Sequence, residues 1–241
     1  MITILYFGIS WIISGWGCCS DGQTGISRIY ARHTMATGYF SMHAYLVQYI
    51  IPLLLYITLM MQEDKAYVVI RYIDREELWR IKISGMIQYV VYFTLIHFGV
   101  DLALLFCCYP PGEVIRSRIL LYLCLFIPNV FLYFIFVATV YLMFQVVFDG
   151  WVAMVLTSGL ALFQYLIMVS EPDASCNPFF FLFLLGIQLQ RGINEADVIL
   201  AYTNVFAIDV IGIMTGLKLY RRKEFSYSYE RTQMQRCVKN E

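Results

Sequence analysis

Six stretches of apolar residues, five long and one shorter, run through this chain of 241 residues. They are nearly free of charge and occupy residues 1–19, 45–61, 83–109, 119–148, 151–169 and 198–217. Because a helix rises about 1.5 Å per residue, roughly 20 apolar residues cross a bilayer core about 30 Å thick. The spacing therefore predicts an all-α, polytopic integral membrane protein with six transmembrane helices.

The composition supports the same interpretation. Hydrophobic residues make up 60% of the chain and charged residues 14%, whereas soluble domains carry about 25% charged residues. A soluble helical protein needs a polar outer face, which apolar runs of this length do not leave. The net charge is zero, which gives no reason to expect nucleic acid as a partner. We therefore expect the chain to sit in a lipid bilayer.

Basic residues gather in alternate gaps between the apolar stretches. Five Lys and Arg residues lie within 62–82 and seven follow residue 217, whereas the gaps on the other side carry five: Arg28, Arg32, Arg116, Arg118 and Arg191. Lys and Arg in short loops favour the cytoplasmic side of the membrane. Both termini are therefore expected in the cytoplasm.

This orientation gives a domain organisation. Residues 1–217 form the six-helix transmembrane domain, with an inner loop at 62–82 and an outer loop at 170–197, and residues 218–241 form a basic cytoplasmic tail. The tail anchors the topology and can also touch anionic lipid. The first stretch has neither a basic start nor a small-residue cleavage site, so we expect a true span rather than a signal peptide.

The inner loop carries the pattern of a short amphipathic helix over residues 74–82. Asp74 is a candidate N-cap, and Glu77 three positions later completes an arrangement like a capping box. Leu78, Trp79 and Ile81 would line one side of this helix. Such a helix lies on a membrane or docks into a partner. The alternative is a solvated connector with snorkelling arginines.

The sequence from residue 70 to residue 79 reads Ile-Arg-Tyr-Ile-Asp-Arg-Glu-Glu-Leu-Trp. It resembles the I-R-Y-x-x-R-x-x-x-W stretch in permease subunits of bacterial ABC exporters, especially small Firmicute permeases linked to peptide export, bacteriocin immunity or antimicrobial resistance. The six spans, the inside termini, the short fourth-to-fifth turn and the long last outer loop are similar to the plan of type-two exporter permeases.

The resemblance implies a function and partners. The chain would be a transport subunit in the bacterial cytoplasmic membrane, exporting a peptide or another amphipathic or hydrophobic substrate as one half of a homodimer. ATP and Mg²⁺ would be held by a separate ATP-binding cassette subunit, and no cofactor by this chain. In such permeases the inner loop contacts the ATPase, which implies that role for Arg71, Tyr72, Arg75 and Trp79.

The outer loop 170–197 has an apolar core of its own at residues 179–187, introduced by Asn177 and Pro178. A segment of this length is too short to span a bilayer and is typical of a re-entrant or interfacial helix. In a type-two exporter this region would form the extracellular gate, here with Phe179, Phe180, Phe181 and Phe183. A helix that lies on the outer leaflet is the alternative.

Two acidic residues fall within the spans, Asp101 in the third and Asp209 in the sixth, with Asn204 close to Asp209. A charge in hydrocarbon costs roughly 2.5–3.5 kcal/mol on insertion scales, so these groups should face protein or water. They either line a substrate or proton path or form hydrogen bonds between helices. Gly212 and Gly216 form a G-x-x-x-G pair that permits close helix approach, as in the seam of a dimer.

The sequence offers no catalytic, cofactor or metal motif. It lacks the G-x-x-x-x-G-K-S/T loop of ATP-binding proteins and the H-E-x-x-H pattern of zinc enzymes, and its seven cysteines include no C-x-x-C pair. Two alternatives to an exporter stay open. One is an ion- or proton-coupled carrier that uses Asp101 and Asp209, and the other is an intramembrane enzyme built on Ser158 and His97.

Overall fold

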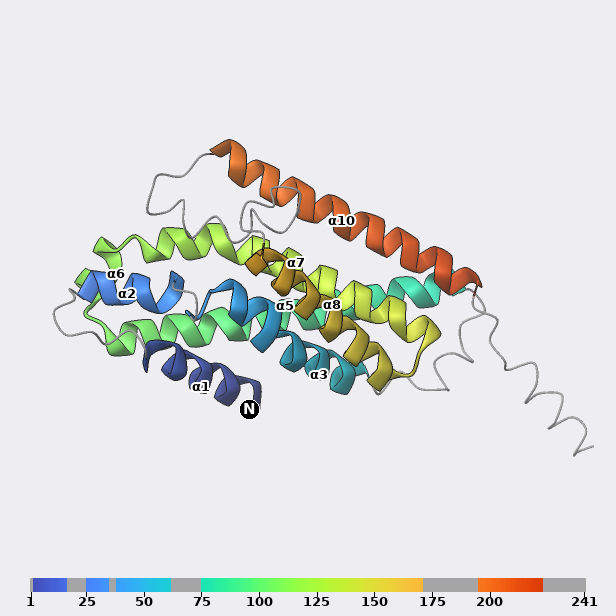
Figure 1. Ribbon diagram of the computed structural model, residues 1–241, viewed down its shortest axis with the longest axis horizontal. Coiled ribbons are helices and arrows are strands. Elements are labelled where there is room, and N and C mark those ends of the chain that lie inside the picture. Colours follow the sequence, from blue (N-terminus) through green and yellow to red (C-terminus); the bar gives the residue numbers. More distant parts are fainter. Residues whose placement is uncertain (1, 17–24, 35–37, 62–74, 171–194, 223–241) are drawn as a thin grey trace, which may run out of the picture.

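The computed structural model describes residues 2–16, 25–34, 38–61, 75–170 and 195–222. Every regular element within these ranges is a helix, as the sequence predicts (Figure 1). In chain order they are α1 (Ile2–Trp16), α2 (Gly25–Thr34), the π-helix η1 (Ala44–Gln48), α3 (Ile50–Met60), α5 (Arg75–Cys108), α6 (Pro111–Arg116), α7 (Ile119–Val147), α8 (Gly150–Ser170) and α10 (Glu195–Arg222).

Four of the described helices have the length and apolar composition of membrane spans. Their apolar parts are Glu76–Cys108, Ile119–Val147, Gly150–Ser170 and Tyr202–Arg221. Shorter apolar helices occupy the positions of the first two expected spans, at Ile2–Ser14 and Ala44–Met60. Each expected stretch overlaps one of these apolar helices, although α5 begins eight residues before the expected third span and α10 ends five residues after the expected sixth.

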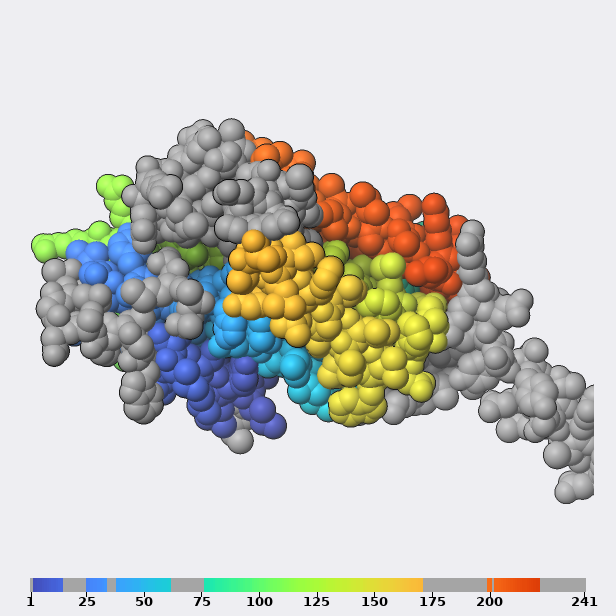
Figure 2. Space-filling view, in the orientation of Figure 1, coloured from blue at the N-terminus to red at the C-terminus, as the bar shows by residue number. Residues whose placement is uncertain are grey.

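Helix α7 lies at the centre of the bundle. It packs against α3, α5, α6, α8 and α10, and its sequence is apolar on all sides, as burial by several neighbours requires. Helix α1 packs on α5 and α2, while α8 and α10 lie on the outside of the bundle (Figure 2). Their outward side chains include exposed Val155, Phe163 and Phe206. Such apolar outer surfaces suit contact with lipid tails.

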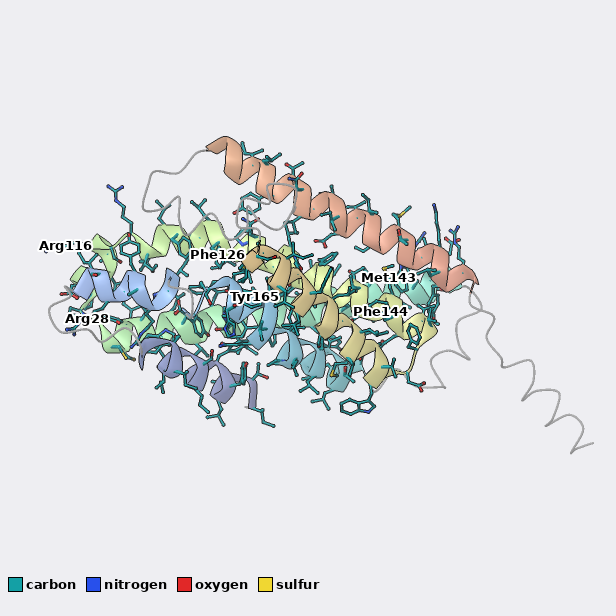
Figure 3. The ribbon with its side chains drawn as sticks, viewed as in Figure 1. Arg28, Arg116, Phe126, Met143, Phe144 and Tyr165 are labelled. Atoms are coloured by element: carbon teal, nitrogen blue, oxygen red, sulfur yellow. The ribbon has the colours of Figure 1, made fainter. Side chains whose placement is uncertain are left out.

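The connections sort into two ends of the bundle. Helices α2 and α6 lie at one end, whereas the start of α5, the turn between α7 and α8 and the last residues of α10 lie at the other (Figure 1). Arg28 and Arg116 mark the first end, far from Met143 and Phe144 (Figure 3). We name these the outer end and the inner end, after the sides that the distribution of Lys and Arg predicts.

The short inner helix expected over residues 74–82 is not a separate element. Helix α5 runs without a break for 34 residues from Arg75 to Cys108, about 51 Å at 1.5 Å per residue. The physical reason is that Leu78, Trp79 and Ile83 form a continuous buried stripe, with no Pro or Gly before Gly85 to interrupt the helix. The inner turns of α5 therefore extend the third span toward the inner end.

Helix α1 is tied to the junction between η1 and α3. The Tyr49 N–H bonds the Ala44 carbonyl five residues back, at 2.8 Å, and so closes the π-helical turn. Pro52 has no N–H for the Gln48 carbonyl, and the Tyr6 hydroxyl donates to that oxygen instead, at 2.8 Å. Tyr6 of α1 thus provides a hydrogen bond to the Gln48 carbonyl, which Pro52 leaves without its helical partner.

The G-x-x-x-G pair of α10 packs within the chain. A Cβ atom built at Gly216 would lie 2.6 Å from Trp79 Cη2, and one at Gly212 would lie 3.3 Å from Thr139 Cγ2. The two glycines therefore let α10 approach α5 and α7 closely. This face is covered in the single chain, so the interpretation of the pair as a seam between two copies is wrong.

Candidate functional site

A buried polar cluster lies at the outer end, where α1, α2 and α5 meet. Asp101 of α5 is fully buried, and its Oδ1 atom has two hydrogen-bonding partners. One is Trp11 Nε1 of α1 at 2.9 Å, and the other is His33 Nε2 of α2 at 3.0 Å. Three segments far apart in the sequence thus converge on one carboxylate.

The hydrogen bonds of His33 indicate which of its ring nitrogens carries a hydrogen. His33 Nδ1 lies 2.6 Å from the Ile29 carbonyl, which can only accept, so we place a hydrogen on Nδ1. Because both His33 Nε2 and Asp101 Oδ1 would carry lone pairs in a neutral imidazole and an ionised carboxylate, their contact needs one shared proton. Whichever atom holds that proton, the pair carries no net charge, which lowers the cost of burying it.

Arg32 closes the cluster on its outer side. Its guanidinium carbon lies 3.8 Å from the centroid of the Trp11 ring and 5.7 Å from that of the Tyr109 ring. A cation over aromatic faces is stabilised by about 0.5–2 kcal/mol, depending on its exposure to solvent. Arg32 therefore holds the indole that donates to Asp101, and α2 supplies both this cation and the imidazole.

His97 lies one turn before Asp101 on α5, inside a cage of aromatic rings. Its imidazole stacks on Tyr39, with ring centroids 4.8 Å apart and planes 8° apart, and Phe7, Tyr49 and Phe98 contact it edge-on. The ring is fully buried, and neither nitrogen has a hydrogen-bond partner among the residues that the structure describes. A second buried imidazole therefore lies one helical turn from Asp101.

Asp209 is separate from this cluster. It lies on α10, is 4% exposed, and neither carboxylate oxygen has a hydrogen-bond partner within the described parts of the chain. Trp79 of α5 contacts Gly216 of α10, so these two residues lie at the same height along the bundle, near its inner end. Counting residues from that level at 1.5 Å each places Asp209 roughly 20 Å from Asp101 along the bundle. The two carboxylates therefore do not form one site, and Asn204, half-buried, lies on α10 with Asp209.

The residues expected to contact an ATPase divide in two. Trp79 is 2% exposed and packs on α10, with its ring 5.5 Å from that of Tyr220. It anchors α5 within the chain and does not present its indole at the surface. Arg75 is the first residue of α5, whereas Arg71 and Tyr72 lie outside the described residues. Their contact with an ATPase stays a prediction.

The expected outer gate also lies outside the described residues. Phe179, Phe180, Phe181 and Phe183 fall within 171–194, and the gate stays a prediction. For the ranges that are described, no group of three or more His, Cys, Asp or Glu side chains is placed to hold a metal ion.

Comparison with known proteins identifies no relative. No protein-family model matches the chain, no curated protein matches it, and no solved structure matches it. Function has therefore to be inferred from the residues and their arrangement alone.

Proposed function

We propose that this chain is the membrane-spanning permease subunit of an ATP-driven exporter in the bacterial cytoplasmic membrane. The observation that carries the proposal is the order of six apolar helices combined with the I-R-Y-x-x-R-x-x-x-W stretch that leads into α5. Four of these helices have the length of spans and two are shorter. The substrate is a peptide or another amphipathic or hydrophobic molecule, and two copies of the chain form the pathway.

The layout of the last four apolar helices supports a topology in which α5 begins and α10 ends on the inner side. The start of α5, the turn from α7 to α8 and the end of α10 lie at one end of the bundle (Figure 1). Residues 62–82 and 218–241, which include the first turns of α5 and the end of α10, carry twelve of the 17 Lys and Arg residues. The second and fourth connections and the end of α10 therefore share one end with most of the basic residues, which fits the preference of positive charge for the cytoplasm.

The inner end of α5 suggests how a partner's motion reaches the spans. The exposed side chains of Glu77 and Arg80 lie on the first turns of α5, which project past the apolar stretch beginning at residue 83. Trp79, buried against Gly216, joins this part of α5 to α10. A push on residues 62–82 by an ATP-binding subunit therefore moves α5 and α10 together. ATP and Mg²⁺ belong to that partner subunit.

The first test is purification of the tagged chain from its native membrane. We expect a P-loop ATPase to copurify in a fixed ratio. Reversing Arg71 and Arg75 together to Glu should reduce this recovery more than about tenfold, because arginines at interfaces are frequent hot spots. Reversing Arg28 and Arg116, which lie at the outer end, should leave it unchanged. Recovery of the ATPase at wild-type yield with both inner arginines reversed would contradict the proposed contact.

A second candidate function is a proton-coupled carrier. The buried contact between His33 and Asp101 favours it, as does the carboxyl of Asp209, which has no hydrogen-bond partner among the described residues. In this case transport depends on the proton gradient, and no ATPase subunit copurifies with the chain.

Asp209→Asn separates a role in transport from a role in packing. Asn keeps the shape of the side chain and most of its hydrogen-bonding capacity but removes the charge. We expect the variant to be produced at the wild-type level and to lose at least about tenfold in transport, because intramembrane carboxylates commonly lie on substrate or ion paths. Asn204→Ala, a half-buried neighbour on the same helix, is the matched control. Normal transport by Asp209→Asn would show that transport does not need the charge of Asp209.

A further inference from the structure

A groove of about 590 Å³ lies between α5 and α10 at the inner end. We call it the inner groove, and the lining residues that matter here are Glu76, Arg80, Ser84, Ile87 and Gln88 of α5 and Met214 and Arg221 of α10. Its volume is within the range of small-molecule sites, about 300–1,000 Å³. We propose that the inner groove binds an anionic phospholipid of the cytoplasmic leaflet. This binding depends on the predicted orientation of the chain in the membrane, and it is the same whether ATP or a proton gradient drives transport.

The rim of the inner groove carries an excess of positive charge. Arg221 donates a hydrogen bond to Glu76, and Arg80 lies 3.9 Å from the same carboxylate. The side chains of Arg80 and Arg221 are 79% and 51% exposed, and among the described residues that line the groove these two guanidinium groups accompany one carboxylate. A phosphate group would place a negative charge beside the exposed guanidinium of Arg80. Basic pockets between spans on the cytoplasmic side recognise anionic headgroups in this way.

Polar side chains continue from the rim into the apolar part of α5. Ser84 and Gln88 follow Arg80 at intervals of four residues and therefore lie in a line along one side of the helix, about 6 Å apart. Both are exposed, and both lie within the apolar stretch that begins at residue 83. An amide or hydroxyl group without a hydrogen bond is costly in hydrocarbon.

The sequence of groups along this line matches a phospholipid. Its phosphate lies nearest to water, at the level of Arg80, and its glycerol and ester carbonyl oxygens lie deeper, where Ser84 and Gln88 can donate to them. The acyl chains then pass over the apolar side chains of Ile87 and Met214, which also line the groove. One ligand therefore accounts for the charged rim, the polar line and the apolar floor.

A second copy of the chain fits the inner groove less well. Two copies related by a two-fold axis through this face would bring like-charged rims together, because Arg80 and Arg221 both lie on it. Like charges placed against each other across an interface cost several kcal/mol. An anionic lipid has the opposite sign of charge and meets no such penalty.

Native mass spectrometry of the purified full chain tests the proposal. The chain is mixed with equal amounts of phosphatidylglycerol and phosphatidylcholine, and we expect it to retain one phosphatidylglycerol in preference. Arg80→Gln should weaken this binding roughly fivefold, the factor that corresponds to about 1 kcal/mol per basic residue near an anionic surface. Arg80→Lys should keep most of it, and Arg116→Gln, at an exposed arginine of the outer end, should not change it.

Several results would overturn the proposal. These are equal retention of the two lipids, unchanged phosphatidylglycerol binding by Arg80→Gln, or displacement of the lipid by millimolar inorganic phosphate, which would show a phosphate site with no lipid specificity. Thermal unfolding of each variant shows whether a loss of binding reflects a loss of fold. Efficient cross-linking between copies through Ser84→Cys in native membranes would show instead that a second copy covers the groove.

Discussion

Gly216→Ala is expected to destabilise the purified chain by about 2–3 kcal/mol in detergent micelles. The added Cβ would lie 2.6 Å from Trp79 Cη2, and it would also approach Met143 Cγ to 3.2 Å. Real Cβ atoms do not come so close to neighbouring atoms, so α10 must move away from α5. Overpacking of this kind typically costs 1–3 kcal/mol. The change is measured as the free energy of unfolding by titration with a denaturing detergent.

Gly99→Ala provides the matched control for this prediction. Gly99 lies in the middle of α5, and a Cβ there meets nothing within 4 Å, so the same substitution should be neutral or slightly stabilising. Trp79→Leu removes the crowding ring atoms, and the double variant with Gly216→Ala should be more stable than the two single changes predict when added. If Gly216→Ala and Gly99→Ala unfold alike, the close approach of α10 to α5 is incorrect.

Asp101→Ala is expected to cost about 3–5 kcal/mol, the usual result of removing one partner from a buried ion pair. The substitution leaves His33 Nε2 and Trp11 Nε1 buried without the oxygen to which both are bonded. Asp101→Asn should cost less, because the amide keeps the shape of the side chain and its oxygen, in the place of Oδ1, can still accept from the indole. Unfolding of the two variants under identical conditions measures the difference.

A double-mutant cycle with His33→Ala tests the pairing itself. The combined loss with Asp101→Ala should be smaller than the sum of the single losses by at least about 1 kcal/mol, because the residues share one interaction. Glu77→Ala, at an exposed carboxyl on the same helix, should change stability by no more than about 0.5 kcal/mol. If the losses in the free energy of unfolding for His33→Ala and Asp101→Ala are strictly additive, the two residues do not interact directly.

The sequence alone determined where the apolar helices lie and that the fold is helical. Long apolar stretches report on this directly, since a span needs roughly 20 apolar residues whatever surrounds it. It also singled out Asp101 and Asp209, because a carboxyl in such a stretch is costly and therefore visible against its background. These are local properties, readable one segment at a time.

Only the tertiary structure decided which groups these residues meet. His33 and Trp11 lie 68 and 90 residues from Asp101 in the sequence, and no local pattern pairs them. The burial of Trp79 depends on Gly216, more than a hundred residues away, which is why a short surface helix was expected where α5 in fact continues. Hydrogen-bond partners and close contacts form between helices, and periodicity within one helix carries no information about the residue that another helix brings to it.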